Sequence, residues 1–150
     1  MSGSERPGSL PPAIAHHTSI ALYKLSHWIG SEMDRALEPI GLKTRHYSVL
    51  SVLTYLGPWS QLAVGQKLRI DRATMVAIVD DLERLGLVER QRSLEDRRNY
   101  ELQLTAAGLH TIQQGEAAIT RLEDELLAAF SKKQRAQLHE IISSLLEKSA

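Results

Sequence analysis

The chain of 150 residues contains no cysteine, which excludes a disulfide framework, a thiolate zinc site and a thiol redox switch. Its formal net charge is zero, so any binding of nucleic acid must depend on local clusters of charge. No apolar run approaches the roughly 18 residues that a membrane-spanning helix needs, and no hydrophobic signal core is found near residue 1. These absences predict a cytoplasmic protein with no membrane partner.

The composition nevertheless favours a folded chain, because 43% of the residues are hydrophobic, which is enough for a core. Residues 1–12 are rich in serine, glycine and proline and predict a flexible polar tail. Apolar residues then recur at helical spacing over 13–38. This pattern predicts one long amphipathic helix that ends near Pro39, since proline lacks the amide that a helix needs.

The rest of the chain alternates between helical and strand patterns. Helices are predicted over 44–56, from Ser60 to Leu68 and from Asp71 to Leu85, because capping residues precede apolar residues at helical spacing. Residues 87–91 and 100–104 alternate apolar and polar side chains, which predicts a hairpin.

Two further helices are predicted after this hairpin, one capped by Thr105 and one by the capping-box pair Ser131 and Gln134. The predicted order of elements is two short helices joined by a tight turn and then a hairpin. This is the order found in a winged helix-turn-helix. The expected fold is therefore mainly α, with the hairpin as the wing.

The second short helix (71–85) has two different faces. Its apolar residues fall on one side, whereas Arg72, Val76 and Ala77 lie towards the other side near the N-terminus, the end that such a helix inserts into a major groove. Arginine can contact phosphate or guanine there, and valine or alanine can contact thymine methyl groups. An amphipathic core helix fits the same pattern, so this segment alone leaves both interpretations open.

Basic charge gathers at the two elements that would face DNA. Residues 67–72 hold three basic side chains against one acid, and residues 90–98 hold four arginines against Glu95 and Asp96. This distribution fits the neutralisation of phosphates. An arginine at the hairpin tip can enter the minor groove, where the negative potential is enhanced, while the two acids brace the second arginine. A solvated charged loop is the alternative.

Residues 70–108, IDRATMVAIVDDLERLGLVERQRSLEDRRNYELQLTAAG, resemble the DNA-binding core of the MarR family of bacterial regulators. The shared motifs are Leu-Gly-Leu-Val at 85–88, Asp-Arg-Arg at 96–98 and Leu-Thr-x-x-Gly at 104–108. The segment GLKTRHYSVLSVL resembles the family's second helix, and FSKKQRAQLHEIISSLLEK resembles its C-terminal helix.

The resemblance implies a homodimer with two winged-helix lobes that bind a pseudo-palindromic DNA site. It implies a dimerisation helix within 13–40, a DNA-binding domain at 41–108 and C-terminal dimerisation helices at 109–150. The family's minor-groove arginine falls on Arg97, with Asp96 as the bracing residue. The predicted DNA-binding residues are Ser60, Gln61, Lys67, Arg69, Arg72, Ala73, Thr74, Val76, Ala77, Arg92, Arg97 and Arg98.

The chain departs from the family pattern in two places. Arg69 stands where the family often has glycine, and Val76 and Ala77 replace residues that are polar or basic in many relatives. The turn before the recognition helix is therefore expected to differ slightly, or Arg69 to add a phosphate contact. Base readout by this helix is expected to be weak and apolar.

The resemblance also implies a small-molecule pocket near the junction of lobe and dimer region. Aromatic and cationic side chains there can hold an aromatic carboxylate by stacking and charge, although such residues are often part of a core. The candidates are His27, Trp28, Arg45, His46 and Tyr47. We therefore expect a transcriptional repressor that a small aromatic or anionic ligand releases from DNA.

Two alternatives stay open: a metal-responsive regulator of the same fold that uses His16 and His17, and a helical dimer module that does not bind DNA. The second would not need the Asp-Arg-Arg tip. The six histidines show no ligand spacing of the His-x3-His kind, and no Ser/His/Asp order falls at a plausible turn. We therefore predict neither an enzyme, nor a metal site, nor a cofactor.

Overall fold

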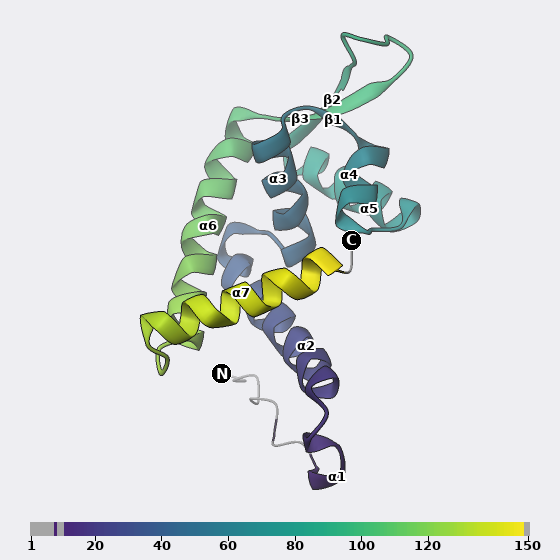
Figure 1. The fold of residues 1–150 in the computed structure, drawn as a ribbon. Coiled ribbons are helices and arrows are strands. Elements are labelled where there is room, and N and C mark those ends of the chain that lie inside the picture. Colours follow the sequence, from purple (N-terminus) through teal and green to yellow (C-terminus); the bar gives the residue numbers. More distant parts are fainter. Residues whose placement is uncertain (1–7, 9–10, 149–150) are drawn as a thin grey trace.

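The computed structural model describes residue 8 and residues 11–148, and it is mainly helical with one small sheet (Figure 1). The helices are α1 (Pro12–Ala15), α2 (Thr18–Leu37), the 3-10 turn η1 (Glu38–Ile40), α3 (Thr44–Leu56), α4 (Gln61–Leu68), α5 (Arg72–Arg84), α6 (Ala106–Leu126) and α7 (Lys132–Lys148). The strands are β1 (Trp59–Ser60), β2 (Val88–Arg92) and β3 (Tyr100–Leu104). The predicted fold class, a winged helix-turn-helix flanked by terminal helices, is confirmed.

The N-terminal helix is not continuous as predicted. The helix over 13–38 is interrupted, because α1 ends at Ala15 and His17 has an extended backbone (φ −88°, ψ 105°) before α2 begins. The rings of His16 and His17 pack against each other with centroids 4.0 Å apart, and histidine has only modest helix propensity. Of the predicted tail, residues 1–7 and 9–10 lie outside the described residues, and Pro12 already begins α1.

The sheet is antiparallel and has the strand order β1-β3-β2. Strand β2 begins at Val88, one residue later than predicted, and pairs Val88 with Leu104 and Arg92 with Tyr100. Strand β1, whose residue Trp59 pairs with Leu102, was not predicted from the sequence. A strand of two residues is too short to show an alternating pattern.

A single hydrophobic core joins the end of α2, the helix-turn-helix, the sheet and the start of α6. Its buried residues are Leu37, Leu42, Val49, Leu50, Leu53, Val64, Met75, Ile78, Val79, Leu82, Leu87, Val88, Leu102 and Ile112. The inner faces of α3 and α5 supply half of this set, so the core fixes α5 against the sheet from which the wing projects.

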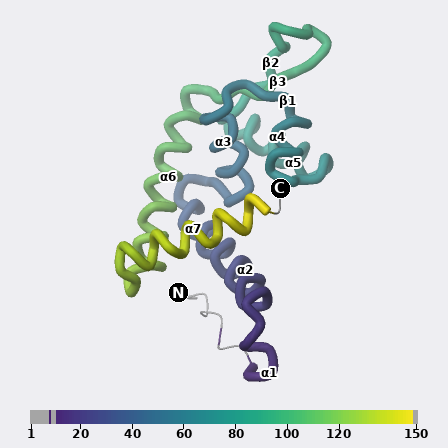
Figure 2. The backbone as a smooth tube through the Cα atoms, viewed as in Figure 1, coloured from purple at the N-terminus to yellow at the C-terminus, as the bar shows by residue number. Residues whose placement is uncertain are grey.

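Helix α7, the yellow tube that crosses the molecule in Figure 2, contributes no residue to this core. It has no buried residue, although one of its faces is apolar. The exposed apolar residues of α7 are Leu138, Ile141, Ile142, Leu145 and Leu146. In the part of the chain that the structure describes, no helix is long and apolar enough to cross a membrane.

Candidate nucleic-acid interface

Two side-chain caps fix the ends of the helix-turn-helix. The amide of Ala63 donates to Oγ of Ser60 at 3.1 Å at the start of α4. At the start of α5, Asp71 accepts the amide of Thr74 at 2.9 Å and its hydroxyl at 2.6 Å. These hydrogen bonds from Thr74 lower the pKa of Asp71, so the cap is charged at neutral pH and complements the positive end of the helix dipole.

Helix α5 presents one face to the core and the other to solvent. Met75, Ile78, Val79 and Leu82 are buried. Among the predicted DNA-binding residues the exposed ones are Lys67, Arg69, Arg72, Ala73, Val76, Ala77, Arg92, Arg97 and Arg98, and the partly buried ones are Ser60, Gln61 and Thr74. The outer face therefore offers one arginine beside small apolar groups, and the Thr74 side chain is engaged in the cap.

The turn between α4 and α5 contains a strained residue. Arg69 ends α4 with φ 53° and ψ 41°, and it is the one non-glycine residue with positive φ in the described part of the chain. The turn is closed by the amide of Ile70, which donates to the Gly65 carbonyl at 2.9 Å. A left-handed conformation costs roughly 1–2 kcal/mol for a residue with a Cβ. An exposed arginine kept at such a position is consistent with a phosphate contact.

We expect Arg69→Gly to separate folding from DNA binding. Glycine adopts this backbone without strain but loses more conformational entropy on folding, about 0.5–1 kcal/mol, so the unfolding free energy should change by less than about 1 kcal/mol. The affinity of the dimer for DNA should fall by roughly one to two orders of magnitude, because each protomer loses one charge-assisted contact. Urea unfolding and DNA titration measure the two effects. Arg69→Asn, which also tolerates this conformation, is the control, and wild-type affinity in both variants would contradict a phosphate contact.

The β2–β3 hairpin projects beyond the helices on the side of α4 and α5 (Figure 1). Arg90 belongs to the basic cluster predicted over residues 90–98. In the structure, however, its positive charge is paired with two carboxylates. Its guanidinium pairs with Asp80 at 3.0 Å and with Glu83, both on α5, and donates to the Gln61 side chain at 3.2 Å. Arg90 thus fastens the wing to α5, and the basic tip consists of arginines further along the loop.

Asp96 at the wing tip was predicted to brace an arginine side chain, but its carboxylate contacts two other groups. Its carboxylate accepts the backbone amide of Arg98 at 3.0 Å and the side-chain amide of Asn99 at 3.2 Å. Asp96 therefore braces the backbone of the tip. Nearer the sheet, the guanidinium of Arg92 lies over the ring of Tyr100, 5.8 Å from its centroid.

The sequence analysis did not select Ser93, whose side chain is buried within the wing loop. A signal was present, because serine hydroxyls commonly accept amides two or three residues later in turns, and Ser93 precedes Glu95 and Asp96 at these spacings.

The five predicted pocket residues differ in burial and in their contacts. His46 is buried, accepts the Lys43 amide at Nδ1 (3.1 Å) and has Nε2 3.5 Å from Asp81 of α5. It borders a cavity of about 430 Å³ together with Asp34, Arg35, Glu38, Gly41, Leu42 and Lys43. His27 and Arg45 are exposed.

Tyr47 packs against α6 at Gly115, where an added Cβ would lie 2.8 Å from the tyrosine ring. The indole nitrogen of Trp28 is buried with no hydrogen-bond partner in the structure. His46 and Tyr47 therefore have packing roles that their sequence position did not reveal.

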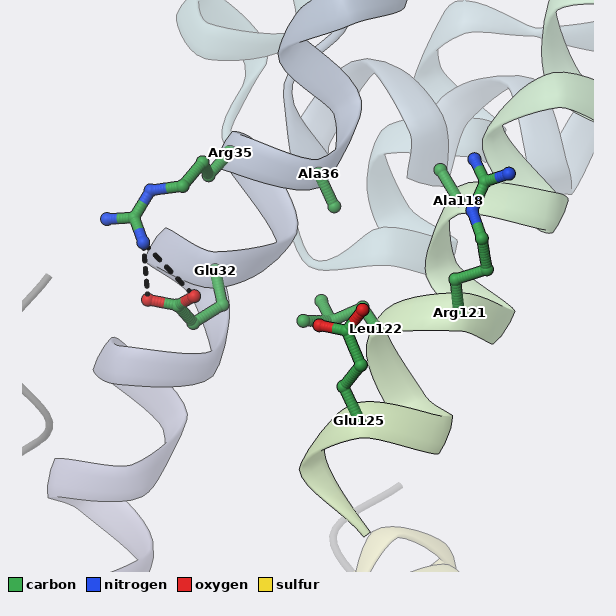
Figure 3. Close-up of a pocket in the computed structure, with 7 residues that line it drawn as sticks. All are labelled: Glu32, Arg35, Ala36, Ala118, Arg121, Leu122 and Glu125. Atoms are coloured by element: carbon green, nitrogen blue, oxygen red, sulfur yellow. Dashed lines mark hydrogen bonds and ion pairs between the residues drawn. The ribbon is translucent and has the colours of Figure 1, made fainter. Parts of the chain in front are cut away.

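A second cavity, of about 270 Å³, lies between α2 and α6 (Figure 3). Arg35 binds Glu32 through hydrogen bonds of 3.1 and 3.2 Å on the α2 side. The lining residues are Glu32, Arg35, Ala36, Ala118, Arg121, Leu122 and Glu125. Both α2 and α6 contribute charged and apolar residues to this cavity. The packing of these two helices against each other could not be predicted from the sequence.

A sequence model described as MarR family matches residues 40–99, which run from η1 through the helix-turn-helix into the wing loop. This part of the chain is similar to the MarR family.

Solved structures of transcriptional regulators match almost the whole chain. The transcriptional repressor CouR bound to a 23-mer DNA duplex is 27% identical with a TM-score of 0.83, over 90% of this chain and 96% of that one. A MarR-family regulator from Rhodococcus sp. RHA1 is 24% identical with a TM-score of 0.81, over 90% and 96%. PcaV from Streptomyces coelicolor, in complex with its natural ligand, is 22% identical with a TM-score of 0.74, over 94% and 99%. The last two matches support the fold alone.

Proposed function

We propose that this protein is a MarR-family transcriptional repressor that binds a pseudo-palindromic promoter site as a homodimer and acts in the cytoplasm. The observation that carries the proposal is the combination, on one lobe, of a capped α5 with an exposed N-terminal face and a projecting wing with exposed arginines. The likeness to CouR bound to a DNA duplex supports this use of the lobe.

A homodimer would cover the apolar surface that a single chain leaves exposed. Helix α7 has no buried residue, and Leu22, Tyr23 and Leu25 of α2 are exposed as well. Burial of such faces across a two-fold axis is the usual way to stabilise a helical dimer. The two-fold axis would set the α5 helices of the dimer roughly 34–36 Å apart, one turn of B-DNA.

In the proposed complex, the α4–α5 turn and the wing contact different grooves of the DNA. Residues near the α4–α5 turn, with Arg72 at their centre, face the major groove and its flanking phosphates. Arg97 enters the minor groove beside it, with Arg92 and Arg98 near the backbone. Because Val76 and Ala77 offer only apolar contact, the direct readout of bases by α5 is expected to be limited.

Selection from a random duplex library tests this function. We expect the full-length protein to enrich pseudo-palindromes whose half-sites lie about 10 base pairs apart. Its binding should weaken steeply with salt, as expected for phosphate contacts, and sedimentation should give a dimer at micromolar concentration. A scrambled duplex of equal composition is the control. Equal affinity for both duplexes would contradict sequence-specific regulation.

We further propose that a small aromatic or anionic ligand releases the repressor from DNA. PcaV was solved with its natural ligand, and CouR from Rhodococcus jostii RHA1 with p-coumaroyl-CoA. The α2–α6 cavity supports the proposal, because apolar Ala36 and Ala118 lie beside the cationic Arg35 and Arg121. No group of three histidine or acidic side chains suited to a metal ion occurs among residues 11–148.

A further inference from the structure

The loop that joins β2 to β3 has one buried side chain. Within residues 93–99, Ser93 is 5% exposed, whereas Leu94 beside it is 100% exposed. A buried hydroxyl needs hydrogen-bond partners, and Ser93 has three. Its Oγ donates to Oε1 of Glu101 on β3 at 2.8 Å. The same oxygen accepts the backbone amides of Glu95 at 3.2 Å and Asp96 at 3.4 Å.

Further hydrogen bonds close the loop around this hydroxyl. The amide of Ser93 donates to the carbonyl of Asn99 at 2.9 Å, and the amide of Asn99 donates to the carbonyl of Asp96 at 2.9 Å. The Asp96 carboxylate in turn accepts the amide of Arg98 at 3.0 Å. Arg97 lies between Asp96 and Arg98, so the backbone is fixed on both sides of a residue whose own side chain is exposed.

A fixed loop changes the free energy of binding through entropy. An arginine on a mobile loop loses both backbone and side-chain conformational entropy when it enters a groove. An arginine on an ordered loop has already lost its backbone entropy on folding, so binding costs it only side-chain entropy. We propose that the Ser93 hydroxyl, held by Glu101, is a positioning residue that pre-organises the wing and sets the direction from which Arg97 approaches DNA. This inference rests on the proposed DNA-binding function and deepens it.

The test is a double-mutant cycle on the full-length protein with its selected operator. Ser93→Ala alone should weaken binding by the dimer roughly 30-fold, because each protomer loses a hydrogen bond with a net worth of about 1 kcal/mol. In an Arg97→Ala background the same change should cost less than about twofold, because the positioned arginine is already gone. The salt dependence of Ser93→Ala should equal that of wild type, since no charge is removed.

Two conservative variants serve as controls. Ser93→Thr keeps the hydroxyl and Glu101→Gln keeps an acceptor oxygen, so both should retain most of the affinity, and Glu101→Ala should not. The thermal midpoint of Ser93→Ala should stay within a few degrees of wild type, because the loop is otherwise exposed.

Three results would count against the inference. Wild-type affinity in Ser93→Ala, or equal losses in the wild-type and Arg97→Ala backgrounds, would overturn it while the proposed function stands. A wild-type protein that shows no preference for any selected duplex would refute the proposed function itself, and the inference with it.

Discussion

Gly108→Ala should lower the free energy of unfolding by about 3 kcal/mol or more. A Cβ built on Gly108 would lie 2.0 Å from the carbonyl oxygen of Leu87 and 3.1 Å from Cδ2 of Leu104. Overpacking of this kind typically costs about 1–3 kcal/mol, and more where the neighbour cannot move. Here the nearest neighbour is backbone, so relief requires α6 to separate from the sheet.

The surrounding hydrogen bonds explain why that separation is costly. The Leu87 carbonyl accepts the amide of Thr105 at 3.1 Å, and the Thr105 hydroxyl donates to the carbonyl of Gly86 at 2.7 Å. The same hydroxyl caps α6 by accepting the amide of Gly108 at 3.0 Å. A shift large enough to admit a methyl group would break the cap and the contact between α6 and the start of β2 together.

Chemical denaturation of both variants at equal protein concentration measures the effect, with Gly115→Ala as the matched control on the same helix. Its Cβ would lie 2.8 Å from the Tyr47 ring, a side chain that can move, and alanine gains about 1 kcal/mol of helix propensity over glycine. We therefore expect a much smaller change there. A Gly108→Ala protein as stable as wild type would show that α6 packs less closely on the sheet than described.

Local features of this fold could be predicted from the sequence because their causes are local. Ser60, Asp71 and Thr105 accept the amides of residues three positions later, so capping residues followed by apolar spacing predicted where α4, α5 and α6 begin. The capping box at Ser131 and Gln134 is also present, with both hydrogen bonds formed.

Features that depend on distant partners could not be predicted in this way. Arg90 was counted with the wing charge because its partners Asp80 and Glu83 are brought to it only by the packing of α5 on β2. His46 was predicted to line a pocket and does border a cavity, but its link from the start of α3 to Asp81 of α5 could not be foreseen. Charge and aromatic character identify residues that can interact, but tertiary packing decides their partners.

Arg97→Ala should weaken binding to the operator by roughly two orders of magnitude at physiological salt. Each protomer loses one charge-assisted contact, worth about 1.5 kcal/mol, and the dimer carries two. The loss should be similar on operators with altered flanks, because an arginine in the minor groove senses groove width more than base identity. Arg72→Ala, by contrast, should change discrimination between operators through the major groove.

Salt dependence and stability separate this role from a general loss of positive charge. The slope of log K against log salt should fall by about 0.9 for each arginine that neutralises a phosphate. Unfolding should be unaffected, because Arg97 is exposed at the loop tip. Lys133→Ala is the matched control, since it removes one exposed charge at the start of α7, at the far end of the molecule from the wing (Figure 1). Wild-type affinity in Arg97→Ala would mean that the paired arginines form a solvated loop and that no minor-groove contact exists.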